Sequence, residues 1–253
     1  MSTLPLNLII FSTTMGHGGR HTYQDCLNSL HSKIDLSIFS NKLLHLKSRD
    51  EEEHIADEIK SFCSHHDIRV IESKEDIVHH SENHLSHSAG YFKDIYTAYS
   101  DLEIRKQKYS LWLEDDWIFK TNDERWDWGF ETSLESAIIE SIKFLDNNPD
   151  QLCVRFNGGE KFCDPEGESN KESENIFTQA INYTEYGPTF TFQPNINRTS
   201  EIFAAWKAGQ NYLDRLGSYH CELMSGDLLK TLTNSDTPFS FFDPNKIYSY
   251  HIG

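Results

Sequence analysis

Short apolar runs alternate with amphipathic segments along the 253-residue chain. The apolar runs predict strands at residues 6–14, 35–40, 68–72, 109–119, 151–156, 189–193 and 247–251. Apolar residues at helical spacing predict helices at about 22–32, 51–64, 89–103, within 126–147, and at 200–208 and 222–233. Because strands and helices alternate, we predict an α/β fold with a mixed, mostly parallel central sheet flanked by helices.

Neither an internal repeat nor a convincing linker divides this pattern. A chain of this length with 37% apolar residues is long enough to bury one sizeable core. We therefore expect a single domain over residues 1–253, with its ligand cleft at the carboxyl ends of the strands. The chain stops directly after the last predicted strand, and we expect it to be the amino-terminal part of a longer multi-domain enzyme.

Three adjacent acidic residues, Glu114, Asp115 and Asp116, lie inside a strongly apolar predicted strand, after Leu-Trp-Leu and before Trp-Ile-Phe. Removing ionised carboxylates from water is costly, and neighbouring like charges add to the cost. A divalent cation compensates such charges, and Mg²⁺ or Mn²⁺ prefers oxygen ligands of this kind. Because side chains alternate along a strand, we expect Glu114 and Asp116 to share one face. The alternative is an acidic run that caps a strand at the surface.

The overall charge limits the partners that the chain can bind. Forty acidic residues against 23 basic ones give a formal net charge of −17, and no Lys/Arg-rich block occurs. Nucleic acid and anionic membrane surfaces are therefore poor partners. A nucleotide diphosphate would also be repelled unless a cation or local amides reversed the sign at its site, so a nucleotide ligand favours a metal.

The cysteines and the hydropathy pattern point to a cytoplasmic protein. Five widely spaced cysteines include no C-x-x-C pair, which favours reduced thiols. No stretch approaches the roughly 20 apolar residues that span a bilayer, and no leader sequence opens the chain. The glycosylation sequons at Asn182 and Asn197 are then expected to be unused.

The segment Leu111-Trp112-Leu113-Glu114-Asp115-Asp116-Trp117 resembles the acidic Asp-x-Asp type motif of glycosyltransferases with the GT-A fold, broadly those of family 2. In that family the motif follows a central strand. The resemblance implies that Glu114 approaches the nucleoside ribose and that Asp116 binds Mn²⁺ or Mg²⁺ bridging the diphosphate. Asp115 joins Glu114 in the implied nucleotide-binding set. The first position here is Glu instead of Asp, which departs from the family pattern.

The opening segment Ile9-Ile10-Phe11-Ser12-Thr13-Thr14 resembles the first strand and nucleotide-contacting loop of the same family. The resemblance implies nucleotide contacts for Ser12, Thr13 and Thr14. We add Asn41, which directly follows the second predicted strand. The glycine-rich stretch after this segment lacks the Gly-Lys-Ser/Thr ending of a Walker loop, so it is not a phosphate loop of that type.

The last predicted strand carries His251, which resembles the histidine that many members of this family supply late in the chain as a further metal ligand. The alternative for a lone histidine is a structural role. Residues 1–120 then correspond to the half that binds the nucleotide sugar, and residues 121–253 to the half that binds the acceptor.

An acidic residue near a predicted helix start is the candidate base. Glu222 precedes the apolar-periodic helix that begins at Leu223, and inverting members of the family use an Asp or Glu in such a place to take the acceptor's proton. Asp227 in the following turn is the second candidate. The alternative for Glu222 is favourable interaction with the helix N-terminus.

Together these features predict a metal-dependent glycosyltransferase that moves a hexose or pentose from a UDP- or GDP-sugar to a carbohydrate or other hydroxyl acceptor, with inversion. A sugar-phosphate nucleotidyltransferase is the enzymatic alternative, because it uses a similar sheet and metal site. A catalytically silent glycan- or nucleotide-binding module is the alternative from a different class.

Overall fold

The computed structural model describes residues 4–14, 22–74, 93–120, 122–123, 128–129, 133–156, 177–179, 194–210, 239–242 and 248–251. Three predicted features lie outside these residues. They are the glycine-rich stretch after the first strand, the strand at 189–193 and the helix at 222–233 with Glu222 and Asp227.

The main sheet has eight strands among the described residues, in the order β3-β2-β1-β4-β10-β8-β11-β9. In chain order these are β1 (Leu4–Thr13), β2 (Phe39–Ser48), β3 (Arg69–Lys74), β4 (Tyr109–Glu114), β8 (Cys153–Arg155), β9 (Phe177–Gln179), β10 (Asn195–Arg198) and β11 (Phe239–Phe242). Two small sheets pair β5 (Trp117–Lys120) with β12 (Tyr248–His251) and β6 (Asn122–Asp123) with β7 (Trp128–Gly129).

Strand direction divides the main sheet into a parallel and a mixed part. Strands β3, β2, β1 and β4 are parallel neighbours, whereas β10 is antiparallel to both β4 and β8. Strand β11 is parallel to β8 and antiparallel to β9. The predicted mixed, mostly parallel sheet is therefore confirmed, and the carboxyl ends of β1, β2 and β4 meet at one edge.

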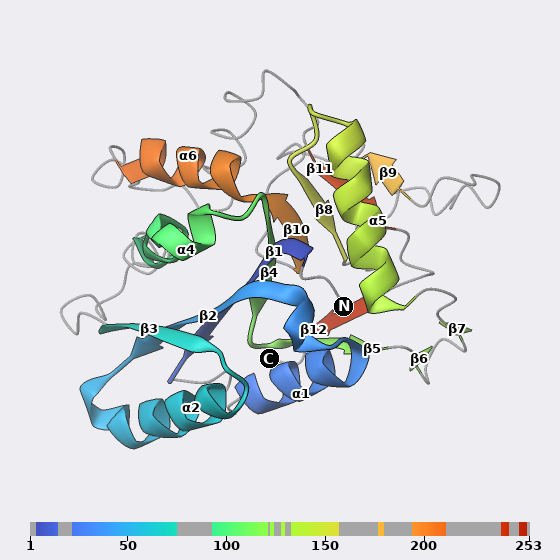
Figure 1. Cartoon of the computed structure of the whole chain (residues 1–253). Coiled ribbons are helices and arrows are strands. Elements are labelled where there is room, and N and C mark those ends of the chain that lie inside the picture. The colour runs from blue at the N-terminus through green and yellow to red at the C-terminus, as the bar shows by residue number, and fades with distance from the viewer. Residues whose placement is uncertain are drawn as a thin grey trace, which may run out of the picture.

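Helices cover both faces of this sheet (Figure 1). They are α1 (Tyr23–Lys33), α2 (Glu53–His65), a helical stretch at 93–100, α4 (Leu102–Arg105), α5 (Leu134–Asn147) and α6 (Thr199–Gly209), with short 3-10 turns η1 (Leu36–Ile38) and η2 (Asp50–Glu52). One core cluster joins α1, α2 and α5 to the sheet, and a second joins residues 93–100, α4 and α6 to the other face.

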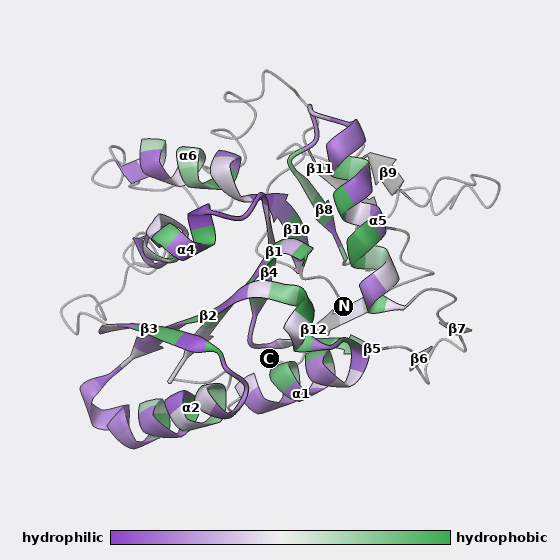
Figure 2. Ribbon diagram, viewed as in Figure 1, coloured by the Kyte–Doolittle hydropathy of each residue, from purple (hydrophilic) through white to green (hydrophobic). Residues whose placement is uncertain are grey.

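Each covering helix is amphipathic, with apolar and hydrophilic residues alternating along it in Figure 2. In α1 the buried positions are Tyr23, Cys26, Leu27 and Leu30, the spacing that places side chains on one helix face. Among the described residues, no helix combines the length and the apolar composition needed to cross a bilayer.

The second strand differs from its prediction. The sequence predicted a strand at 35–40, but η1 occupies half of that range and β2 runs from Phe39 to Ser48. Its polar residues obscured the pattern, because His45 is buried and the Lys47 Nζ lies 2.9 Å from Asp94 Oδ2. Two residues that are usually exposed thus belong to a buried strand.

The helix predicted at 89–103 is also divided. Residues 93–100 are helical, and α4 begins after Asp101. The Asp101 carboxylate accepts hydrogen bonds from the backbone N–H groups of Glu103 and Ile104 at 3.0 and 3.3 Å. Asp101 is therefore an N-cap that starts a new helix, which a continuous apolar period does not reveal.

Strand β10 was not predicted, because its sequence Asn-Ile-Asn-Arg reads as polar. The structure buries these polar side chains in a hydrogen-bonded network. Asn197 donates to Asn195 Oδ1 at 2.9 Å and accepts from the Tyr99 hydroxyl at 3.1 Å. The sequon at Asn197 therefore lies in a buried strand, which agrees with the expectation that it is unused.

Candidate active site

Strand β4 ends at Glu114, the chain turns at residues 115 and 116, and β5 begins at Trp117. We call Glu114–Asp116 the acid turn. The continuous strand predicted at 109–119 is therefore wrong, and strand alternation does not place Glu114 and Asp116 on one face. Aspartate favours turns because its side chain can bond to nearby backbone groups.

Burial distinguishes the acid turn from an ordinary acidic surface run. Asp115 is 3% exposed and Asp116 is 4% exposed, whereas Glu114 is half-buried. Buried carboxylates require compensation by hydrogen bonds or by a cation. The alternative of a solvated acidic cap is thus disfavoured for these two aspartates.

The end of β1 holds the first aspartate of the turn. The backbone N–H of Asp115 donates to Phe11 O at 2.9 Å, one residue beyond the point where Phe11 pairs with Glu114. The Ser12 hydroxyl donates to Asp115 Oδ2 at 2.5 Å. Both the backbone and the side chain of Asp115 are therefore fixed to β1.

Helix α1 holds both stems of the turn. The Cys26 thiol lies 3.7 Å from Glu114 O, within hydrogen-bonding range for sulfur. The Ser29 hydroxyl donates to Phe119 O and accepts from Phe119 N, each at 2.8 Å. Cys26 and Ser29 are three residues apart, so they lie on one helix face. We did not identify either residue from the sequence, where this spacing of small polar side chains is the available signal.

The aspartates of the acid turn act on the cysteine beside them. The pKa of the Cys26 thiol is raised well above its usual value, first by burial and then by the charges of Asp115, Asp116 and Asp25. Hard carboxylate oxygens of this kind fit a divalent cation such as Mn²⁺ or Mg²⁺. Among the side chains that the structure describes, no group of three or more His, Cys, Asp and Glu is arranged to hold a metal ion, and the side chain of His251 is not one of them.

The last described strand runs beside the turn. Strand β12 pairs antiparallel with β5, and His251 lies opposite Trp117, the residue that follows the acid turn. The backbone N–H of Ser249 donates to Phe156 O at 3.3 Å, which ties β12 to the end of β8. Directly opposite residues in an antiparallel pair have Cα atoms about 4.5–5.5 Å apart. The structure therefore brings His251 close to the acid turn from 135 residues away in the sequence (251 − 116).

The predicted nucleotide-contacting hydroxyls at the end of β1 make protein contacts. Besides the Ser12 contact, the Thr14 hydroxyl donates to Glu52 Oε2 at 2.6 Å and accepts from Arg49 N at 3.2 Å. Thr13, the last residue of β1, is half-buried and pairs with Lys47. All three lie at the same edge of the sheet as the acid turn.

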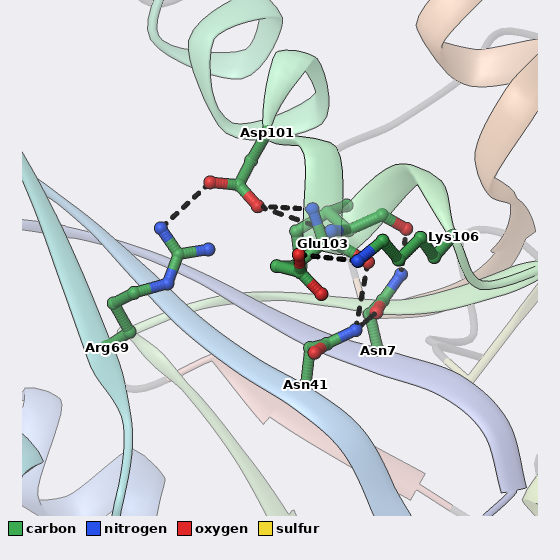
Figure 3. A network of polar contacts seen from close by, with 7 residues as sticks. Asn7, Asn41, Arg69, Asp101, Glu103 and Lys106 are labelled. Atoms are coloured by element: carbon green, nitrogen blue, oxygen red, sulfur yellow. Dashed lines mark hydrogen bonds and ion pairs between the residues drawn. The ribbon is translucent and has the colours of Figure 1, made fainter.

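Asn41 lies at the opposite edge of the sheet. It pairs with Asn7 near the start of β2, and its amide donates to Asn7 Oδ1 at 2.9 Å and to Glu103 O at 3.0 Å (Figure 3). The structure does not bring Asn41 to the other candidate residues. The second strand was predicted to end at residue 40, whereas β2 runs from Phe39 to Ser48.

No protein-family model and no curated protein matches the sequence. Comparison of structures finds GalNAc-T7 with UDP, GalNAc and Mn²⁺, at 10% identity and a TM-score of 0.50, over 99% of this chain and 44% of that one. The chain has the GT-A fold. It spans less than half of GalNAc-T7, so the likeness concerns the shared fold.

Two further structures match with TM-scores below 0.50. Residues 1–349 of TarS from S. aureus, in complex with UDP, match at 13% identity and a TM-score of 0.45, over 96% of this chain and 58% of that one. A putative glucose-1-phosphate thymidylyltransferase from Bacillus anthracis, in complex with sucrose, matches at 8% identity and a TM-score of 0.49, over 97% and 89%.

Proposed function

We propose that the chain is a metal-dependent glycosyltransferase that uses a UDP- or GDP-sugar and a hydroxyl acceptor. The observation that carries the proposal is the acid turn. It presents two buried aspartates at the carboxyl edge of a parallel sheet, and a distant strand brings a histidine beside them. Ligands of open α/β sheets bind at that edge. The shared fold with GalNAc-T7, which was crystallised with UDP and Mn²⁺, supports the same class.

In this proposal Asp116 and His251 hold Mn²⁺ or Mg²⁺, and Glu114 approaches the nucleoside ribose. Asp116 would supply a carboxylate oxygen, which suits these hard cations, and His251 would supply an imidazole nitrogen. When bound, the cation supplies Lewis-acid stabilisation of the charge on the leaving diphosphate.

Glu222 is the proposed base that takes the proton of the acceptor hydroxyl, with Asp227 as the second candidate, and the reaction inverts the anomeric carbon. Both residues lie outside the described residues, as does most of the proposed acceptor half at 121–253. The single-domain organisation belongs to the same proposal. A cytoplasmic location is also part of it, supported by the free, buried thiols of Cys26, Cys63 and Cys153.

Calorimetric titration of UDP and GDP, with and without Mn²⁺, tests the donor site in wild type and Asp116→Asn. We expect one nucleotide to bind only with Mn²⁺, and Asp116→Asn to weaken that binding by at least roughly 100-fold, because a ligand matters more than the outer-shell partners that cost 10- to 100-fold. Asp57→Asn is the matched control, since Asp57 is exposed on α2. Its binding should equal that of wild type.

Turnover assays with nucleotide sugars and with nucleoside triphosphates distinguish the alternatives. Release of UDP or GDP from a sugar conjugate supports the transferase. Release of pyrophosphate from a triphosphate with a sugar 1-phosphate would instead identify a nucleotidyltransferase. Nucleotide binding that Asp116→Asn leaves unchanged, together with no turnover, would identify a silent binding module and overturn the proposal.

A further inference from the structure

The shortest described contact to the acid turn comes from a residue that the sequence assigned to the nucleotide. Ser12 is 7% exposed, and its hydroxyl donates to Asp115 Oδ2 at 2.5 Å. We propose that Ser12 is a positioning residue, which fixes the Asp115 carboxylate and thereby sets the acid turn for a divalent cation. This inference rests on the proposed function, and it replaces a nucleotide contact for Ser12 by a role within the protein.

The contact has the geometry of a strong hydrogen bond. A hydroxyl has one proton to donate, and here it points to a carboxylate oxygen. Hydrogen bonds from hydroxyl groups to ionised carboxylates are about 2.5–2.7 Å long and roughly twice as strong as neutral ones. A single proton committed in this way is not available to a nucleotide.

Two successive β1 residues act on Asp115 together. Phe11 O accepts from the Asp115 backbone N–H, while Ser12 holds its side chain. One bond sets the path of the chain and the other sets the side-chain rotamer. The stems on either side are held by Cys26 and Ser29 of α1. The direction in which the chain leaves Asp115 toward Asp116 is therefore fixed before any ligand binds.

The chemical nature of the donor also matters. A serine hydroxyl is neutral, so it orients a carboxylate without cancelling its charge, whereas a lysine or arginine would do both. An orienting group that brings no counter-charge suits a cation site, because outer-shell partners that orient metal ligands tune the affinity for the metal.

The test measures Mn²⁺ affinity by electron paramagnetic resonance of the free ion, in protein without nucleotide and again with UDP or GDP. We expect Ser12→Ala to weaken Mn²⁺ binding by about 10- to 100-fold, the range for outer-shell partners. Ser12→Thr keeps the hydroxyl, and its affinity should stay within about threefold of wild type. A role in packing alone predicts the reverse order, because threonine adds a methyl group at a buried position.

Ser40→Ala is the matched control. Ser40 lies on β2 at the opposite edge of the sheet, where its hydroxyl donates to Leu4 O at 2.6 Å. It should lower thermal stability slightly and leave Mn²⁺ affinity unchanged. Ser12→Cys, which is close to serine in size and has only a weak S–H donor, replaces Ser12→Ala if the alanine variant does not fold.

The outcomes separate this inference from the proposed function. The role of Ser12 would be overturned if Ser12→Ala and Ser12→Cys both bound Mn²⁺ as tightly as wild type while Asp116→Asn lost binding. The transferase proposal would then remain intact. Wild-type protein that binds no Mn²⁺, with or without nucleotide, would overturn the proposed function and this inference with it.

Discussion

The two edges of the parallel sheet differ in the partners that their buried polar groups contact. At the edge that carries Asn41, amide groups donate to carbonyl oxygens, and the Asp101 carboxylate pairs with Arg69 at 2.8 Å. At the acid turn, a neutral hydroxyl donates to Asp115, and burial together with the charges of Asp115 and Asp116 raises the pKa of the Cys26 thiol. Charge at the Asn41 edge is thus balanced within the protein.

This difference indicates what each edge does. The Asn41 edge joins α4 to β1 and β2 through bonds that run from Asn7 to Ile104 O and from Asn41 to Glu103 O (Figure 3). Such a network stabilises the fold and requires no ligand. The acid turn is fixed in position by β1 and α1 and places buried carboxylates together, which are groups that a divalent cation can bind. Two kinds of variant test this difference. Substitutions at the Asn41 edge should lower stability, and substitutions at the acid turn should lower metal affinity.

The largest expected effect is on stability at the Asn41 edge. Asn7 is fully buried, donates to Ile104 O and to Ser110 Oγ, and accepts from Asn41. Asn7→Ala leaves these partners unsatisfied, and we expect about 2–4 kcal/mol lower unfolding free energy. Urea unfolding measures it. Asn147→Ala, at an exposed position on α5, should stay within about 0.5 kcal/mol of wild type.

Mn²⁺ affinity is the second readout of the same variant. Asn7→Ala protein that remains folded should bind Mn²⁺ as wild type does, because no bond of this network reaches the acid turn among the contacts described above. A loss of Mn²⁺ affinity comparable to that of Asp116→Asn would show that the two edges are coupled, and the comparison would fail.

The next effect concerns His251 at the acid turn. We expect His251→Ala to weaken Mn²⁺ binding by roughly 100-fold, or about 2.7 kcal/mol, if it supplies a ligand next to Asp116. Unfolding free energy without metal should change by less than about 1 kcal/mol. His54→Ala, at an exposed position on α2, is the control and should change neither quantity. Unchanged Mn²⁺ affinity in His251→Ala would leave this histidine a structural role.

Sequence patterns predicted correctly those helices and strands in which the apolar residues, spaced at the helix or strand period, are also the buried ones. Strand β1 and helices α1, α5 and α6 lie close to their predicted positions, because most of their buried residues are apolar. Strand β3 also lies close to its predicted position, with Val70 and Ile71 partly buried. Strand β10 was missed, since its buried asparagines are satisfied by partners such as Tyr99 that are distant in the sequence. Polar side chains that pair with residues distant in the sequence produce no alternation of apolar and polar residues along the strand, so the strand could not be detected from its own sequence.

The candidate site follows the same division. The acid turn and His251 were recognised from motif resemblance, and their proximity follows from the pairing of β5 with β12. The role of Ser12 depended on where one hydroxyl points, and sequence pattern does not contain that information. Asn41 lies at the other edge of the sheet because it pairs with Asn7 near the start of β2, whereas the sequence predicted a strand that ends at residue 40.

The smallest expected effect is the pH dependence of the stability that the Asp101 carboxylate contributes at the Asn41 edge. Burial tends to raise the pKa of Asp101, but hydrogen bonds from Arg69 and from the N–H of Ile104 outweigh it, so the pKa lies below its usual value. The ionised form is therefore favoured by folding, and its contribution is present above about pH 4, the value in the unfolded chain. It is lost as pH falls through the lower pKa of the folded state.

Asp101→Asn isolates this charge, because asparagine caps a helix about as well as aspartate. At pH 7 we expect the variant to be less stable by under about 1 kcal/mol, since Arg69 is 46% exposed and solvent screens the pair. At pH 3 the difference should shrink toward zero in urea unfolding. An equal difference at both pH values would mean that the cap is lost instead of the charge. Added Mn²⁺ should leave the difference unchanged at pH 7, because this edge already contains its own counter-charges.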